Sequence, residues 1–315
     1  MKLTKESFLW VEKYRPSTVS DCILPARLKK VFQEFVDQKS IPNLMLTGSA
    51  GVGKTTIAKA MCDEIGLNSM LLNSSDERGI AIMQNKIKNY ASTISLTGGR
   101  KVIILDEADY LTPDAQAALR GMIELFAENC SFIFTCNFKA RLIDALHSRC
   151  SVVDFNLTGG EKQDMALQFF NRAQGILKAE NVEYDKKVLA ELVQKYFPDY
   201  RRTLNELQRF SKFGAIDQNI LAQVSDVRKM GDLIAALKSK DFGSMRKWVI
   251  NNSDIDPASV YRKIYDGMND YLKPESIPQA VVIIARYQYQ AAFVADQEVN
   301  LVAALTELMV DCEYV

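Results

Sequence analysis

Residues 48–55, which read Gly-Ser-Ala-Gly-Val-Gly-Lys-Thr, decide the fold of this chain. They fit the pattern G-x-x-x-x-G-K-[ST] without a mismatch, after the apolar run Asn43–Thr47 and at the start of the helical pattern Thr55–Ile65. In this context glycines let backbone N–H groups turn toward a phosphate, and the helix N-terminus adds partial positive charge. We predict that Lys54 contacts the β- and γ-phosphates of a nucleoside triphosphate and that the Thr55 hydroxyl binds Mg²⁺. An ordinary glycine-rich turn would leave the flanking strand and helix unexplained.

The first half of the chain alternates short apolar runs with amphipathic stretches. The predicted strands are Asn43–Thr47, Met70–Asn73, Lys101–Asp106, Ser131–Cys136 and Ser151–Phe155. The helical patterns between them are Thr55–Ile65, Gly79–Ser95, Pro113–Glu128 and Ala140–His147. Strands separated by helices indicate a parallel sheet covered on both faces, and the uniformly apolar centre of the third strand is typical of such a sheet.

The strand pattern stops after Phe155, and nearly every later segment has the periodicity of a helix. We place one boundary near Asn156–Gly160 and another near Val224–Gly231. The sequence therefore predicts an α/β nucleotide-binding domain over residues 1–157 and two helical domains over 158–226 and 227–315.

Two acids follow the predicted buried strand, and an amide follows its expected neighbour. Asp106 and Glu107 come directly after Leu105, and Asn137 directly after Cys136. An acid at the end of such a strand can hold magnesium through water, here Asp106, and the next acid, Glu107, can polarise the attacking water. Two solvated acids at the end of a strand would be common by themselves, but this interpretation is improbable in a chain that also carries a phosphate loop at this separation. Asn137 could contact the γ-phosphate, although an isolated asparagine at a strand end is more often a turn residue.

Composition bounds the remaining possibilities. The 315 residues are 48% hydrophobic and 25% charged, which predicts a folded protein with a hydrophobic core. The 39 basic residues balance 39 acidic ones, which excludes a nucleic-acid-binding protein that is polybasic over its whole length. No long apolar stretch opens the chain or recurs in it, so we expect no secretory signal, no membrane span and a cytoplasmic location. Six scattered cysteines and a single histidine, His147, argue against a zinc site.

Several further motifs resemble those of one family. The stretches are Trp10–Pro16 (WVEKYRP), Ser74–Ile80 (SSDERGI) and Ser148–Cys150 (SRC). They look like the boxes of sliding-clamp loader AAA+ ATPases, which include the small subunits of replication factor C. The segments Phe197–Arg201 (FPDYR) and Cys22–Pro25 (CILP) more closely resemble the large clamp-loader subunit of T4-like bacteriophages. The resemblance covers essentially the whole chain and is strongest to about residue 209.

This resemblance implies an AAA+ domain, a small helical lid and a C-terminal helical collar that holds a ring together. It implies an ATPase that uses ATP and Mg²⁺ to open a sliding clamp and close it around primer–template DNA. The expected partners are the clamp, a companion clamp-loader subunit and copies of the same chain in a pentameric ring, with no membrane; for a phage protein the location would be the host cytoplasm.

The resemblance also assigns roles by position. The residues expected to border the adenine and ribose are Val11, Glu12, Lys13, Tyr14 and Ile23. Those expected to hold the phosphates are Gly51, Val52, Gly53, Lys54, Thr55 and Thr56, with Thr55 and Asp106 serving the metal. Asn137 matches the sensor of the γ-phosphate, and Arg201 matches a second sensor from the lid. Glu107 is the catalytic carboxylate expected to polarise the attacking water.

Charged residues outside the expected pocket are given two further roles. Arg149 matches an arginine finger that enters the neighbouring subunit's site, where a permanently charged guanidinium can stabilise a transferring phosphoryl group. Without the flanking motifs, a helix-capping arginine would be favoured. Arg78, Lys86 and Lys88 match the DNA-contacting helix, and a solvated charged helix is the alternative.

Two rival functions remain open on the sequence. One is another AAA+ DNA-remodelling ATPase, such as a helicase loader or a branch-migration motor. The other is a scaffold subunit that does not hydrolyse ATP. The presence of all the residues expected to serve hydrolysis argues against it: Lys54, Asp106, Glu107 and Arg149. The letters DEAD at residues 106–109 also occur in RNA helicases, but a helicase needs a second domain of alternating strands and helices, and the rest of this chain is helical.

Overall fold

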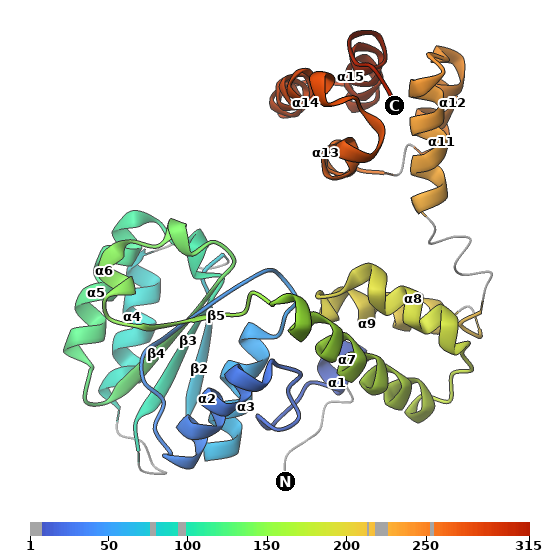
Figure 1. The fold of residues 1–315 in the computed structure, drawn as a ribbon. Helices are drawn as coiled ribbons and strands as arrows, with labels where there is room; N and C mark the ends of the chain where they lie inside the picture. The colour runs from blue at the N-terminus through green and yellow to red at the C-terminus, as the bar shows by residue number, and fades with distance from the viewer. Residues whose placement is uncertain (1–7, 76–79, 94–98, 213, 218–225, 253–254) are drawn as a thin grey trace. The chain divides into compact units, whose positions relative to one another are not determined.

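The computed structural model describes residues 8–75, 80–93, 99–212, 214–217, 226–252 and 255–315. The chain forms two compact units, Met1–Ile220 and Leu221–Val315, which Figure 1 shows in blue to yellow and in orange to red. The division into three domains at residues 157/158 and 226/227 stays a prediction.

A parallel five-stranded sheet forms the centre of the first unit, as predicted. Its strands lie in the order β2-β3-β4-β1-β5. Their bounds are β1 Leu44–Thr47, β2 Ser69–Asn73, β3 Lys101–Asp106, β4 Cys130–Cys136 and β5 Ser151–Asp154. Each lies within a residue of the predicted run at either end, because the β-branched and apolar runs that mark a buried strand are local features of the sequence.

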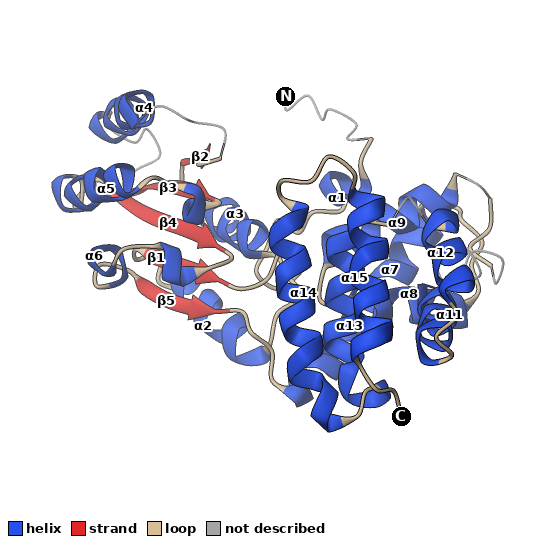
Figure 2. Ribbon diagram, turned by 90° about the horizontal axis from the view of Figure 1, so that it is seen from above, coloured by secondary structure: helices blue, strands red, loops and turns tan. Residues whose placement is uncertain are grey.

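Helices cover both faces of this sheet (Figures 1 and 2). The helices that precede residue 158 are α1 Trp10–Lys13, α2 Ala26–Asp37, α3 Lys54–Ile65, α4 Ile80–Ser92, α5 Pro113–Leu125 and α6 Asp144–His147. Side chains alternate along β3: Val102 and Ile104 pack with α2 and α3, whereas Ile103 and Leu105 pack with α4 and α5. Because both faces are covered, the carboxyl edge of the sheet is the surface left for a site.

The predicted helix over Ala140–His147 is wrong. The chain forms a short 3₁₀ turn, Lys139–Arg141, then an extended link, and only then α6. The buried side chain of Gln116 occupies this link: its Nε2 donates to the Arg141 carbonyl at 3.1 Å, and its Oε1 accepts from the Ile143 N–H at 2.8 Å. A side chain from α5 thus takes the place of helical hydrogen bonds.

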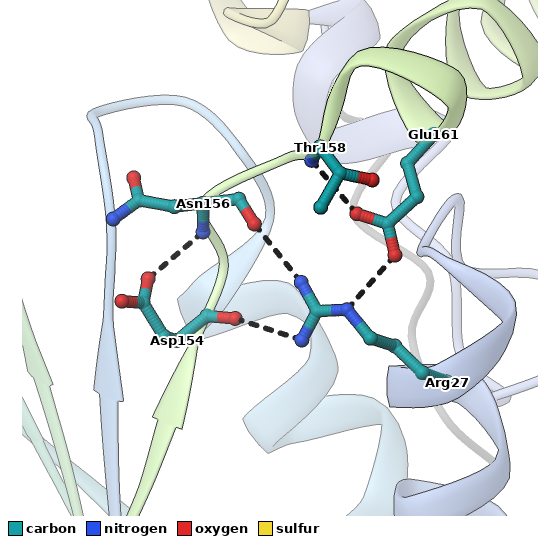
Figure 3. A network of polar contacts seen from close by, with 5 residues as sticks. All are labelled: Arg27, Asp154, Asn156, Thr158 and Glu161. Atoms are coloured by element: carbon teal, nitrogen blue, oxygen red, sulfur yellow. Dashed lines mark hydrogen bonds and ion pairs between the residues drawn. The ribbon is translucent and has the colours of Figure 1, made fainter.

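Three helices complete the first unit, and a polar network fixes their attachment to the sheet. They are α7 Gly159–Ala179, α8 Lys186–Tyr196 and α9 Tyr200–Ser211. Figure 3 shows Arg27 of α2 donating to Glu161 Oε1 at 2.8 Å and to the carbonyls of Asp154 and Asn156 at 3.4 and 2.9 Å. Glu161 also accepts from the Thr158 N–H at 2.9 Å and so caps α7. The link between sheet and helices is therefore held by side chains rather than left as a free loop.

The second unit is helical. Its elements are α11 Asp226–Lys238, α12 Phe242–Asn251, α13 Pro257–Tyr271, a 3₁₀ turn Pro274–Ser276, α14 Ile277–Ala291 and α15 Gln297–Asp311. It has its own core, in which the fully buried Tyr261 ring lies and the buried Asn300 amide donates to the Tyr261 hydroxyl at 3.3 Å. On α14, Ile283 and Ile284 are buried while Tyr289 is 73% exposed, so within its own unit this helix buries one side only.

No helix in the described part of the chain combines the length and the apolar character that spanning a membrane requires.

Candidate nucleotide-binding site

The phosphate loop lies between β1 and α3, as its sequence pattern predicts. Gly51 and Gly53 adopt φ values of +75° and +96°, which side-chain-bearing residues rarely adopt. The left-handed conformation lets consecutive N–H groups face one concavity, at the N-terminus of α3. The loop lines the main pocket of the first unit, together with the carboxyl edge of the sheet and α9.

The lysine of this loop is buried and already held in place. Lys54 is 8% exposed, and its Nζ donates to the carbonyls of Gly48 and Ser49 at 2.8 and 2.7 Å and to Asn137 Oδ1 at 2.9 Å. Burial lowers the pKa of Lys54 below its ordinary value, and the nearby negative charge of Asp106 opposes that shift. The ammonium group therefore stands beside the loop and links it to the end of β4.

Oxygen atoms suited to Mg²⁺ meet at the ends of α3, β3 and β4. The Thr55 hydroxyl donates to Asp106 Oδ1 at 2.6 Å, and the Thr135 hydroxyl donates to the same oxygen. Hydroxyl and carboxylate oxygens are the hard ligands that Mg²⁺ prefers, directly or through water. Thr55 and Asp106 are thus chemically able to hold the metal, and both line the pocket.

Two further acids lie in the turn after β3. Glu107 lines the pocket with φ +55°, and its backbone N–H donates to the Thr135 hydroxyl at 3.2 Å. Asp109 is 6% exposed, and its Oδ2 accepts from the N–H groups of Asn137 and Phe138 at 3.3 and 3.2 Å. The expected water-polarising acid and the expected γ-phosphate sensor thus stand at neighbouring strand ends.

Residues of α7 and α9 form the opposite wall. The rings of Phe169 and Tyr200 pack with centroids 4.6 Å apart, and burial raises the pKa of Tyr200. The Tyr200 N–H donates to the Gly51 carbonyl at 3.2 Å, which ties the start of α9 to the phosphate loop. Arg201 lines the pocket, and so does Arg172 of α7. The structure therefore places the expected second sensor at the pocket.

The N-terminal segment brings some of the residues expected near the adenine to the pocket. Val11, Tyr14 and Ile23 line the pocket. Glu12 instead pairs with Arg15, whose Nε donates to it at 3.1 Å, and the Lys13 Nζ donates to Glu180 Oε1 at 2.7 Å. Neither Glu12 nor Lys13 is among the pocket-lining residues, and their side chains are engaged with Arg15 and Glu180.

Arg149 lies away from the chain's own pocket. Its Nε donates to Glu124 Oε1 at 2.9 Å and its Nη1 to the Ala145 carbonyl at 2.8 Å. The Arg149 side chain remains 25% exposed. Any role in hydrolysis would have to be played in a different copy's site.

Two of the three predicted DNA-contacting residues lie on α4. Lys86 and Lys88 are exposed on that helix, outside the pocket. Arg78 falls outside the described residues.

Several residues that line this pocket were not predicted from the sequence. Those near the strand ends are Asp109, Thr135 and Cys136; those from the helical wall are Phe169, Arg172, Ile176, Tyr200 and Leu204. A local signal existed for Thr135 alone, because a strand's period of two puts it on the same side as Asn137. The helical wall depends on how α7 and α9 fold against the sheet.

The sheet order, the phosphate loop after β1 and the acids after β3 together define a P-loop nucleoside triphosphatase. Two family models match: "ATPase family associated with various cellular activities (AAA)" over residues 44–156 and "Sliding-clamp-loader large subunit, AAA+ ATPase lid domain" over residues 161–222. Solved structures of RuvB from Thermotoga maritima are similar in fold, with a TM-score of 0.54 at 15% identity over 73% of this chain and 82% of that one.

Curated relatives share much more of the sequence. The sliding-clamp-loader large subunit of Enterobacteria phage T4 is 34% identical over 96% of both chains. That of Escherichia phage RB69 is 39% identical over 75% of each. The replication factor C small subunit of Sulfurisphaera tokodaii is 33% identical over 97% of this chain and 96% of its own. The chain belongs to the sliding-clamp-loader family of AAA+ ATPases, and it is a nucleotide-binding ATPase.

Proposed function

We propose that this chain is an ATPase subunit of a clamp loader, which uses ATP to open a sliding clamp and place it on primer–template DNA during replication. The observation that carries the proposal is the convergence of Lys54, Asp106, Glu107 and Asn137 on one pocket, in a chain similar to clamp-loader subunits over nearly its whole length. A companion subunit, further copies of this chain in a five-membered ring and a cytoplasmic location belong to the same proposal.

The roles of the pocket residues follow from their placement. The N–H groups of the loop and the Lys54 ammonium hold the triphosphate, while Arg201 approaches it from α9. Glu107 takes up the proton of the attacking water. Asn137, whose side-chain oxygen accepts a hydrogen bond from Lys54, contacts the γ-phosphate. Thr55 and Asp106 would hold Mg²⁺, which supplies charge neutralisation between the phosphates when bound. Val11, Tyr14 and Ile23 would border the base.

Arg149 is proposed to act in a neighbouring copy. Its guanidinium is partly exposed and forms an ion pair with the exposed Glu124; such a pair near the surface contributes little stability and can be exchanged for a phosphate. Exposed Lys86 and Lys88, with Arg78, would contact DNA phosphates, so this contact should be independent of sequence and weakened by salt.

Steady-state ATP hydrolysis by the full chain, with clamp, companion subunit and primed DNA, tests the proposal. We expect strong stimulation by clamp plus primed DNA, and its loss in Glu107→Gln. Arg149→Ala should lower the rate by about 10³-fold or more, while the matched control Arg141→Ala, an exposed arginine stacked on Phe138, should not. Stimulation by junction or fork DNA without a clamp would instead identify a branch-migration motor or helicase loader, and the similarity to RuvB concerns the fold alone.

A further inference from the structure

Two buried polar residues at the pocket have no part in the chemistry proposed above. Thr135 near the end of β4 is 2% exposed, and Asp109 in the turn after β3 is 6% exposed. Both line the nucleotide pocket. A buried carboxylate is costly unless its hydrogen bonds compensate for the lost water, so its presence here calls for a physical reason.

The Thr135 hydroxyl holds the two acids of the turn after β3. It accepts from the Glu107 N–H at 3.2 Å and donates to Asp106 Oδ1. Glu107 has the left-handed φ of +55°, which is uncommon for a residue with a side chain. One hydroxyl from β4 thus fixes both the metal-side carboxylate and the backbone that directs the Glu107 side chain.

The Asp109 carboxylate, in the turn after β3, holds the backbone that follows β4. Its Oδ2 accepts from the backbone N–H groups of Asn137 and Phe138 at 3.3 and 3.2 Å. Its Oδ1 is buried without a hydrogen-bond partner. The Asn137 side chain, whose Oδ1 accepts from Lys54 at 2.9 Å, points where this backbone directs it.

The two strands themselves do not align these groups. The ladder between β3 and β4 ends with the pair Leu105 and Phe134. Glu107 and Asn137 both follow that last pair. The residues before them, Asp106 and Cys136, pair with Asn73 of β2 and Thr47 of β1 instead, so no hydrogen bond of the β3–β4 ladder sets the separation of Glu107 and Asn137. A side chain from each segment instead binds the backbone of the other: Thr135 binds the turn, and Asp109 binds the segment after the strand.

We propose that Thr135 and Asp109 are positioning residues that hold Glu107 and Asn137 at a fixed separation for hydrolysis. The inference rests on the proposed roles of those two residues. Loss of either brace should lower kcat while ATP binding, which depends on the phosphate loop, is kept. A merely structural role would lower stability and leave kcat per folded molecule unchanged.

Near-isosteric variants test the Thr135 brace in the full chain with its clamp, companion subunit and primed DNA. Thr135→Val keeps the shape and removes the hydroxyl, so kcat should fall about 10- to 100-fold. Thr135→Ser keeps the hydroxyl and should retain most of the rate. The Kd of a fluorescent ATP analogue should change less than about threefold in either variant, an effect smaller than the loss of one typical hydrogen bond. Equal rates for the two variants would overturn this half of the proposal.

The Asp109 brace is tested through the residue on which it acts. Asp109→Ala should lower kcat about tenfold or more, and Asp109→Asn, whose carbonyl oxygen can accept the same two N–H groups, should restore most of it. In an Asn137→Ala background, Asp109→Ala should cost little further, because the amide that it positions is gone. Fully multiplicative losses in the double variant would refute the claim that Asp109 acts through Asn137.

The same measurements separate failure of this inference from failure of the proposed function. If wild type does not hydrolyse ATP, or Asn137→Ala hydrolyses it normally, the proposed roles themselves fail. If wild type is active and Asn137→Ala is not, but the Asp109 and Thr135 variants keep full kcat, only the positioning role fails. Thermal unfolding of each variant gives the folded fraction to which kcat is normalised, and if Thr135→Val does not fold, the Asp109 series decides.

Discussion

Replacing Gly51 by alanine should destabilise the first unit more than the same replacement of Gly53, although both glycines have left-handed backbones. The φ values are +75° and +96°, so either alanine costs about 1–2 kcal/mol in backbone strain. At Gly53 an added Cβ meets nothing within 4 Å. At Gly51 it would lie 1.8 Å from Asp199 Oδ1, an overlap that forces the aspartate away.

Moving Asp199 removes the N-terminal cap of α9. Its Oδ1 accepts from the Arg202 N–H at 2.9 Å, and losing such a cap costs about 1 kcal/mol. We therefore expect Gly51→Ala to cost about 2–3 kcal/mol and Gly53→Ala about 1–2 kcal/mol. The difference of about 1 kcal/mol isolates the contact between the phosphate loop and α9.

Urea unfolding without nucleotide measures this difference. The sequence contains two tryptophans, Trp10 in the first unit and Trp248 in the second, so a Trp248→Phe background leaves the first unit as the fluorescent one. The backbone N–H of Trp10 donates to Oε1 of Gln208 on α9 at 3.0 Å, and the Trp10 side chain is buried, so its fluorescence should report the docking of that helix. A difference of about 1 kcal/mol separates the two midpoints by about 0.3–1 M urea.

Adding Asp199→Ala gives the decisive control. With the carboxylate gone, Gly51→Ala should cost no more than Gly53→Ala. Equal midpoints for the two single variants, or an extra cost of Gly51→Ala that survives in the Asp199→Ala background, would refute the clash as the reason.

Three further predictions follow from individual contacts. Burial holds the pKa of Lys54 below its ordinary 10.5, so the free ammonium loses its proton at a lower pH than an exposed lysine does. ATP affinity should therefore fall as pH rises through that lowered pKa. Stability without nucleotide should rise over the same window, since the unfolded lysine still binds a proton there, and Lys54→Arg, which stays charged, should abolish both trends in binding and unfolding titrations. Gln116→Ala should lower the free energy of unfolding by about 1–3 kcal/mol in thermal unfolding, because it leaves buried backbone groups without a hydrogen-bond partner. Arg120→Ala, at an exposed position, should change it by no more than about 0.5 kcal/mol. Equal changes for the two variants would contradict the bridging role of Gln116. Glu180→Gln weakens the acceptor of the Tyr14 hydroxyl and should raise the Kd for ATP by about two- to fivefold at low salt and less at high salt. An unchanged Kd would show that this contact does not contribute to ATP binding.

The sequence by itself determined the elements whose cause is local. The phosphate loop needs glycine where φ is positive, and Lys54 and Thr55 must open the following helix, so the motif specifies geometry as well as composition. The inner strands β1, β3 and β4 were predictable to within a residue because burial on both faces imposes mainly apolar runs. Parallel strands bring their carboxyl ends to one edge, which is why Asp106 and Asn137 could be placed together in advance.

Only the tertiary structure decided the contacts that join distant segments. Asp109 and Asn137 lie 28 residues apart, Lys13 and Glu180 are separated by 167, and no local pattern signals either pair. The helix expected over Ala140–His147 failed for the same reason, since its backbone hydrogen bonds are replaced by a side chain of another helix. Local periodicity records which face of an element is buried, whereas the partner on that face is set by strand order and by the docking of α7 and α9.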